Sequence, residues 1–378
     1  MLYFSLLLVC LSSLISFGLL VGPVPPLRGG ISDFNNELIS TINKKHNISI
    51  LSFSILYPRF FFPGKNQFHN KSANFKKIKT INPYNPFSYL IINKYLKHVN
   101  PDVILSTHWN PFFSITYSII NKIVPKRILK IGLLHNINSH ENRILDRFFT
   151  NIYLNSLNKF VTLSKHTLDQ ISNKNGISLF HPIPNLKQKL INKNEIIKDL
   201  NIKSSKKIFL HFGIVRKYKG LELLIKSFKL AFEKDNNIHL VIVGEFYDNL
   251  RNYQELLKKL DLEEHVTIHN KFVAESEIKK WFSIADFVIQ TNLNATQSGI
   301  ISIAIYFEKI IITTAQGGIK EILNDGNSFI CEKNSKSISD NILKAIDSNL
   351  NEKTKQLKIL KKKLNWDSFS KQLLDFIK

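Results

Sequence analysis

The chain has 378 residues, of which 44% are hydrophobic, and its formal net charge is +23 at pH 7. This length and composition exclude a disordered or fibrous protein and predict two globular domains of ordinary size. Residues 1–200 hold 24 basic and 8 acidic side chains, whereas residues 201–378 hold 28 and 21. The positive field of the first half favours phosphorylated small molecules, an anionic membrane or nucleic acid as partners, and an ordinary lysine-rich surface is the alternative.

The first 22 residues carry no charged side chain, a length that a membrane span or a signal segment would need. No basic residue precedes Arg28, which argues against a signal peptide. We prefer a buried strand from Ile15 to Val21, followed by a Pro/Gly loop and a helix from about Ser32. Residues 1–13 then form an apolar extension that is an anchor, a signal segment or the result of a wrong start codon.

Cys10 and Cys331 are the two cysteines of the chain, and no Cys/His spacing typical of zinc surrounds them. The sequence therefore predicts neither a disulfide framework nor a metal site, and it fits a reducing cytoplasm.

Short apolar runs alternate with amphipathic ones along the chain, a pattern typical of βαβ units and parallel sheets. After the strand that ends at Val21, strands are predicted at 48–53, 102–107, 128–135, 159–164, 207–213, 238–244, 266–269, 286–291 and 309–314. The series pauses in a polar, lysine-rich stretch near residues 184–204, which marks a domain boundary. We therefore predict α/β domains at 14–188 and 189–364, followed by a closing segment at 365–378.

Two loops have the composition of anion sites. The strand that ends at Gly213 leads into a loop with Arg216 and Lys219 and then a helix, where backbone N–H groups, the helix dipole and cations all favour negative charge. After the strand at 286–291, the amides of Ser298, Gly299 and Ile300 begin another element. By β-propensity alone the following "IISIAIYF" predicts a strand.

Six segments in this order resemble a retaining glycosyltransferase of the GT-B fold, close to glycosyltransferase family 4. They are "VGPVPPLRGGIS" (21–32), "HNINSHE" (135–141), "FGIVRKYKGLELLIKSF" (212–228), "LVIVGEF" (240–246), "ATQSGIISIAIYFEKIIITTAQGGIKEIL" (295–323) and "NWDSFSKQLLDFIK" (365–378). The resemblance implies two Rossmann-like domains facing each other across a cleft, with the C-terminal helix packed back on the first. It also makes residues 295–303 a loop and helix, against the β-propensity.

The resemblance assigns roles to residues of the second domain. The donor diphosphate would be bound by Arg216, Lys219, Ser298, Gly299 and Ile300. The rest of the donor cleft would be formed by Gly213, Gly244, Glu245, Gln297, Gly317 and Gly318.

In the first domain the resemblance makes His135 the catalytic candidate that contacts the transferred sugar. A strand-end histidine bonded to backbone is the alternative. The acceptor side would include Gly29, Gly30, His140 and Glu141, and the last two are alternatively a helix cap or a catalytic pair. The spacing of His135 and His140 is not that of a zinc site.

The sequence departs from the family pattern at two places. Two glutamates that the family usually carries fall on Ala295 and Ile303, and Ile214 stands where an arginine usually follows the glycine. Since these glutamates would contact the donor, a donor-binding but inactive partner of a polysaccharide assembly complex is an alternative to the enzyme. We interpret the pattern as a subgroup of active enzymes.

The activity implied is transfer of a hexose-type sugar from a nucleotide sugar to a glycan or lipid-linked hydroxyl, with retention, in polysaccharide and cell-envelope biosynthesis. No DxD motif occurs in the sequence, so neither a metal nor a cofactor is expected. Residues 57–99 contain eight basic and no acidic side chains among many aromatics, which favours peripheral contact with an anionic membrane. We expect a cytoplasmic protein at the inner face of the plasma membrane, and no nucleic-acid partner because no binding module is present.

Overall fold

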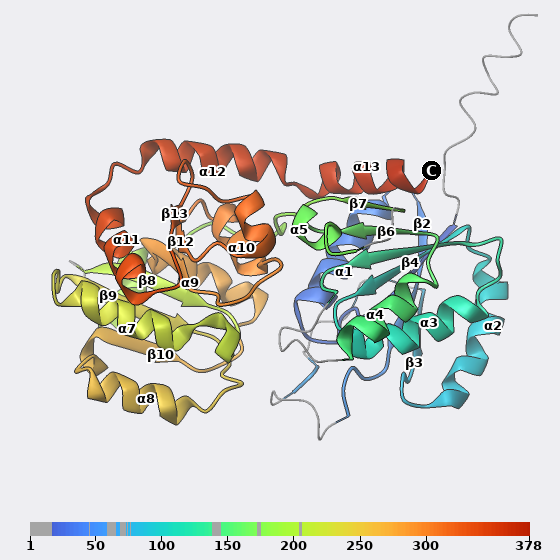
Figure 1. Ribbon diagram of the computed structural model, residues 1–378, viewed down its shortest axis with the longest axis horizontal. Coiled ribbons are helices and arrows are strands. Elements are labelled where there is room, and N and C mark those ends of the chain that lie inside the picture. The colour runs from blue at the N-terminus through green and yellow to red at the C-terminus, as the bar shows by residue number, and fades with distance from the viewer. Residues whose placement is uncertain are drawn as a thin grey trace, which may run out of the picture. The chain divides into compact units, whose positions relative to one another are not determined.

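The computed structural model describes residues 17–44, 46–58, 66–68, 73, 75, 77–137, 145–171, 175–203 and 206–378. The chain divides into two compact units (Figure 1). Unit 1 runs to Phe180 and includes Trp366–Lys378, and unit 2 is His181–Asn365. The first division thus lies just before the lysine-rich stretch in which the sequence predicts it, and the second lies at the predicted start of the C-terminal helix.

Unit 1 contains a seven-stranded parallel sheet in its described part, in the order β3-β2-β1-β4-β5-β6-β7. Its elements are β1 (Phe17–Val21), α1 (Gly30–Ile42), β2 (Asn47–Phe53), β3 (Ile78–Ile81), η2 (Pro86–Tyr89), α2 (Leu90–Val99), β4 (Val103–His108), η3 (Pro111–Phe113), α3 (Ser114–Ile123), β5 (Leu129–Leu134), α4 (Asp146–Leu154), β6 (Lys159–Thr162), α5 (Lys165–Leu168), β7 (Gly176–Ser178) and α13 (Trp366–Ile377).

Unit 2 contains a six-stranded parallel sheet in the order β10-β9-β8-β11-β12-β13. Its elements are α6 (Lys193–Asp199), β8 (Lys207–Phe212), η4 (Lys217–Lys219), α7 (Leu221–Phe232), β9 (Ile238–Val243), α8 (Leu250–Lys259), η5 (Glu263–His265), β10 (Val266–His269), η6 (Glu275–Glu277), α9 (Ile278–Ile284), β11 (Phe287–Gln290), α10 (Gly299–Tyr306), β12 (Ile310–Thr313), η7 (Gly317–Glu321), β13 (Phe329–Ile330), α11 (Ser335–Asp347) and α12 (Asn351–Lys363). The predicted fold class of two Rossmann-like parallel-sheet domains is confirmed.

Helices cover both faces of the unit 1 sheet, which explains the uninterrupted apolar strands. Successive strand residues enter opposite cores: Leu19 packs with side chains of α2, α3 and α4, and Leu20 packs with side chains of α1 and α13. On α13, the aromatic residues Trp366 and Phe369 contact the Phe34 ring at centroid distances of 4.9 and 5.8 Å. The expectation that the C-terminal helix packs on the first domain is therefore confirmed, with α13 beside α1 in Figure 1.

The predicted strands are present with ends shifted by a residue or two, and Ile15 lies outside the described residues. Three strands were missed: β3, β7 and β13. β3 is a partly exposed edge strand with lysine and threonine, while β7 and β13 have three and two residues. Such short or polar segments become strands because a neighbouring strand offers hydrogen bonds, a condition that local sequence does not reveal.

The β-propensity prediction for "IISIAIYF" was wrong, because these residues form helix α10. The helix buries Ile301, Ala304 and Ile305 and packs on α12 and β12. Burial of one helical face outweighs the small intrinsic preference of β-branched residues for strands. The loop and helix implied by the family resemblance are confirmed.

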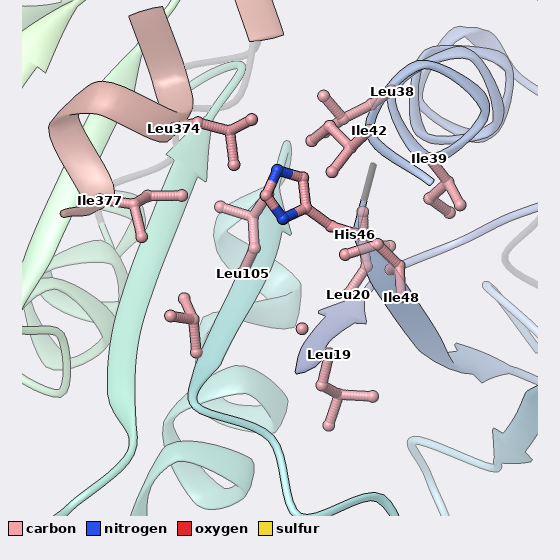
Figure 2. Close-up of a pocket in the computed structure, with 12 residues that line it drawn as sticks. Leu19, Leu20, Leu38, Ile39, Ile42, His46, Ile48, Leu105, Leu374 and Ile377 are labelled. Carbon is pink, nitrogen blue, oxygen red and sulfur yellow. The ribbon is translucent and has the colours of Figure 1, made fainter. Parts of the chain in front are cut away.

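A small apolar cavity lies in unit 1, among the first residues of β1 and β4 and the helices α1 and α13 (Figure 2). Its lining includes Leu19, Leu38, Leu105 and Ile377, with His46 as the one polar side chain. Its volume of about 40 Å³ is too small for a nucleotide, and its wall offers no phosphate-binding group. The cavity lies away from the carboxyl ends of the strands, where a ligand is expected.

Candidate functional site

The carboxyl ends of the unit 2 strands carry four loops that contain the predicted donor residues. From β8 the chain adds β9 and β10 on one side of the sheet, and then β11, β12 and β13 on the other side. The direction of the strand order therefore reverses between β8 and β11. Ligands of open α/β sheets bind at such a switch point, beyond the carboxyl ends of the strands. The loops after β8 and β11 are therefore the first place to look for a site.

The loop after β8 presents two cations. Arg216 precedes η4, and its guanidinium lies 4.8 Å from the centre of the Tyr247 ring, a contact that holds the side chain in place. Lys219 ends η4 and is half-buried, and burial lowers the pKa of its ammonium group to about 8. In the described part of the chain neither cation forms an ion pair. Even a half-buried cation is costly without a counter-charge, which favours an anionic ligand at this loop.

Gly220 joins this loop to the one after β11. Its φ is +69°, and a Cβ atom at this position would lie 2.1 Å from the carbonyl oxygen of Thr291. The Thr291 hydroxyl donates to the Gly220 carbonyl oxygen over 3.0 Å, and the Leu293 amide donates to the Tyr218 carbonyl oxygen over 2.8 Å. The two loops are thus locked together, which fixes the position of Lys219 relative to the α10 loop.

The N-terminus of α10 is open toward solvent. Ser298 precedes the helix in extended conformation and its buried hydroxyl has no hydrogen-bond partner. Nothing lies within 4 Å of a Cβ atom built on Gly299, while the side chain of Ile300 is 3.2 Å from one built on Gly213. The structure therefore brings Ser298, Gly299 and Ile300 beside the basic loop, as predicted.

The remaining donor-side residues of the prediction surround the same loops. The Gly318 amide donates to Thr296 over 3.0 Å, which ties the turn at Gly317, with φ +52°, to the loop before α10. Gln297 is half-buried next to Ser298. Glu245 is buried, and its carbonyl oxygen accepts from the Val215 amide over 3.0 Å. These contacts connect the turn after β9 to the loop that carries the cations, and the turn after β12 to the loop before α10.

Sequence reasoning missed three buried polar residues at this edge: Gln290, Asn292 and Thr313. Asn292 is completely buried, and neither its amide nitrogen nor its side-chain oxygen has a hydrogen-bond partner in the described structure. The side-chain oxygen of Gln290 and the hydroxyl of Thr313 are likewise without partners. Buried polar atoms are costly unless paired, so their concentration at the strand ends indicates that a ligand or water pairs them. Their signal in the sequence was a polar residue at or just after the end of the apolar strands β11 and β12.

In unit 1, His135 follows β5 and is buried, with its ring 4.5 Å from that of Phe34. Its amide donates to the His108 carbonyl oxygen over 2.8 Å. Gly29 and Gly30 begin α1 and have open space around them, since nothing lies within 4 Å of a Cβ atom built on either. His140 and Glu141 lie outside the described residues. The roles of these four acceptor-side residues and of His135 remain predictions.

His108 is a buried histidine whose carbonyl oxygen accepts the hydrogen bond from the His135 amide. Its Nδ1 and Nε2 atoms lie 2.9 and 2.8 Å from the Asn136 carbonyl oxygen and the Ser114 hydroxyl, and its ring stacks on Tyr153 at 4.8 Å. Burial lowers the pKa of His108 to about 4. In unit 2 the buried His211 has its pKa lowered to about 4 as well, by burial and by the charge of Lys219.

These two histidines predict a loss of stability in mild acid. Because their pKa falls from 6.5 to about 4 on folding, the unfolded chain binds more protons between these values, and stability decreases as pH falls through this window. We expect each to lower the free energy of unfolding by about 1.4 kcal/mol per pH unit there. Urea unfolding at pH 7.5, 6 and 5 measures this slope. The variant His108→Gln should reduce it, whereas His98→Gln, which changes an exposed histidine, should not; equal slopes in both would contradict the prediction.

Within the described ranges, no group of three or more His, Cys, Asp or Glu side chains is arranged to hold a metal ion. None of the helices in those ranges combines the length and the hydropathy that a bilayer crossing requires.

Comparison with solved structures identifies the fold. Anabaena HepE, in its complex with UDP and glucose, superimposes with a TM-score of 0.74 at 14% identity, over 95% of this chain and 98% of that one. The lipopolysaccharide outer core galactosyltransferase WaaB, in its apo form, gives a TM-score of 0.69 at 12% identity, over 96% and 99% of the two chains. This chain has the GT-B fold.

Sequence comparison finds a family match within unit 2. Residues 192–364 match the family described as glycosyl transferases group 1. An uncharacterized glycosyltransferase of Haemophilus influenzae is 25% identical over 208 residues, which is 53% of this chain and 54% of that protein. The chain thus aligns with about half the length of this curated relative. Together with the fold, these matches support a glycosyltransferase, and the matched region contains every predicted donor residue.

Proposed function

We propose that the protein transfers a sugar from a nucleotide sugar to an acceptor hydroxyl, with retention of configuration and without a metal ion. The observation that carries the proposal is the half-buried Lys219 beside Arg216, which have no carboxylate partner in the described chain and stand next to the open N-terminus of α10. Cations and helix amides together suit the diphosphate of a nucleotide sugar. The donor class agrees with the UDP and glucose in the HepE complex.

The chemistry assigned to the site follows from its charges. The bond between the anomeric carbon and the diphosphate oxygen breaks, the acceptor oxygen bonds to that carbon on the same face, and the acceptor proton passes to the departing diphosphate. Lys219 and Arg216 neutralise the charge that develops on this leaving group, and the amides of Gly299 and Ile300 add donors to it. Fixed donors and cations lower the barrier because they need no reorganisation during the reaction.

The acceptor is proposed to be a glycan or a lipid-linked sugar of the cell envelope. WaaB, which shares the fold, is a galactosyltransferase of the lipopolysaccharide outer core, so this fold serves such acceptors in that protein. Transfer of a hexose and a place at the inner face of the plasma membrane are parts of the same proposal.

The test is a panel of UDP-, GDP- and ADP-sugars, followed by thermal shift and by release of the free nucleoside diphosphate. The wild type should be stabilised by one nucleotide series and should release its diphosphate slowly, and both effects should be lost in Arg216→Ala with Lys219→Ala. The double variant Lys226→Ala with Lys234→Ala, on exposed positions of unit 2, is the charge-matched control and should behave as the wild type.

An inactive nucleotide-sugar-binding protein is the competing function, because glutamates are absent at Ala295 and Ile303. It predicts a different result in the same test. Stabilisation without release of diphosphate, even with membrane extract as the acceptor source, would favour an inactive nucleotide-sugar-binding partner in an assembly complex. No response to any nucleotide sugar would overturn both functions.

A further inference from the structure

Six large apolar side chains stand exposed on neighbouring segments of unit 1. They come from the loop after β3, from η2 and α2, and from η3 and α3, and we call them the α2–α3 surface: Tyr84, Phe87, Leu90, Phe112, Ile115 and Ile119. Phe87 and Leu90 are 77% and 73% exposed, and Phe112 is 55% exposed. Such exposure of aromatic and aliphatic side chains on adjacent elements marks an interaction site.

Contacts between the segments make this surface continuous. The rings of Tyr84 and Phe112 lie 5.9 Å apart, which joins the loop after β3 to η3. The Tyr89 hydroxyl lies 3.3 Å from that of Thr116, which joins η2 to α3. Helices α2 and α3 also contact each other directly, and Figure 1 shows both on the same side of the unit 1 sheet.

The outward face of both helices changes from apolar to basic side chains along the chain. On α2, Leu90 is followed by Lys94 and Lys97, and on α3, Ile115 and Ile119 are followed by Lys122, all of them exposed. Spacings of three and four residues place these side chains on one helical face. Each helix therefore begins apolar, near the carboxyl ends of the strands, and becomes basic farther from that edge.

The segment of the chain that carries the surface has almost only positive charges. Residues 77–130 contain eight lysines and arginines, and Asp102 is their only carboxylate. Exposed aromatic and aliphatic side chains flanked by lysines suit a bilayer with anionic headgroups. The apolar side chains would insert at the boundary of the acyl chains, and the lysines would bind the headgroup phosphates. A nucleic acid would be matched by the lysines but not by the exposed leucine and isoleucines, and a soluble protein partner would not require so one-sided a charge.

We propose that the α2–α3 surface docks unit 1 on an anionic membrane. Phe87 and Phe112 follow β3 and β4, and His135 and Gly29 follow β5 and β1, so the surface and the predicted acceptor loops share one edge of the sheet. Docking there holds the acceptor loops close to the bilayer, where a lipid-linked acceptor is anchored. This last step rests on the proposed transferase function, whereas the docking itself does not.

The experiment is sedimentation of the full-length protein with vesicles of phosphatidylcholine alone or with phosphatidylglycerol. The wild type should bind the anionic vesicles, and added salt should weaken the binding because ions screen the lysines. The variant Phe87→Ser with Leu90→Ser should bind about tenfold more weakly. The variant Lys94→Gln with Lys97→Gln should bind about thirtyfold more weakly, since each lysine near an anionic surface contributes to binding.

Matched controls use exposed residues of unit 2. Leu230→Ser with Ile359→Ser removes comparable apolar side chains, and Lys362→Gln with Lys363→Gln removes the same charge; both should bind vesicles as the wild type. Every variant keeps residues 1–16, so differences between them report on the exchanged side chains. A thermal unfolding scan verifies that each variant is folded.

Three results would overturn the proposal: no binding to anionic vesicles, equal binding by the surface variants and their controls, or a lysine-dependent retention on RNA that vesicles do not displace. Thermal shift with the nucleotide-sugar panel, without vesicles, separates this proposal from the function. The surface variants should retain the donor response of the wild type. Vesicle binding without any donor response would leave the docking surface valid and remove the transferase.

Discussion

Replacing Lys219 with alanine is expected to lower the rate of sugar transfer by about a hundredfold to a thousandfold, the usual effect of losing one group that stabilises developing charge. Lys219 is half-buried, its position is fixed by the contact between Gly220 and Thr291, and it has no ion-pair partner in the described structure. Its ammonium group is therefore available to the diphosphate leaving group. Release of nucleoside diphosphate under single-turnover conditions measures the effect.

Lys217 supplies the control for this prediction. It belongs to the same short helix η4 but is exposed, so Lys217→Ala should reduce the rate little. Equal losses in both variants would mean that only the general positive field of the loop matters. An unchanged rate in Lys219→Ala would remove Lys219 from the proposed site.

The lowered pKa of Lys219 adds a pH dependence with a defined sign. Burial holds the pKa at about 8, so the cation is present below pH 8 and is lost as pH rises through that value. We expect kcat/KM of the wild type to fall above about pH 8, because this parameter reports the free enzyme. The variant Lys219→Arg stays charged throughout this range, so its decline should be absent.

Replacing Gly244 with alanine is expected to destabilise unit 2 by about 3 kcal/mol or more, from backbone strain and steric overlap together. Gly244 has a φ of +149°, and a Cβ atom there would lie 1.9 Å from the carbonyl oxygen of Gly213. Backbone atoms cannot move aside as a flexible side chain can, so the strands β8 and β9 would have to separate at their ends. Thermal unfolding should show a decrease of about 5–10 °C in Tm.

Gly299→Ala is the matched control for stability. Gly299 is the first residue of α10, no atom lies within 4 Å of a Cβ atom built on it, and its φ is not in the positive range. The unfolding temperature of the variant Gly299→Ala should therefore stay near that of the wild type or rise slightly. If Gly244→Ala unfolds at the same temperature as Gly299→Ala, the close approach of the two loops is not a constraint on the fold.

The architecture can be predicted from local sequence, because strands buried on both faces must be apolar throughout. Runs such as "IHLVIVG" and "DVILST" are recognisable without any tertiary information, and the alternation with amphipathic helices leaves parallel sheets as the fitting arrangement. The basic loop before α7 was also recognisable from the sequence, because Arg216 and Lys219 stand between an apolar strand and an amphipathic helix.

Features that depend on contacts between residues distant in sequence become visible only in the folded chain. Residues 299–306 include four β-branched isoleucines, yet they form a helix because α12 and β12 bury one of its faces. The strands β3, β7 and β13 exist through pairing with an adjacent strand, and the exposure of Phe87 and Leu90 follows from which helical faces the sheet covers. Asn292 became a candidate only when its buried amide proved to have no partner, since burial and hydrogen bonding belong to the folded chain and not to any local run of residues.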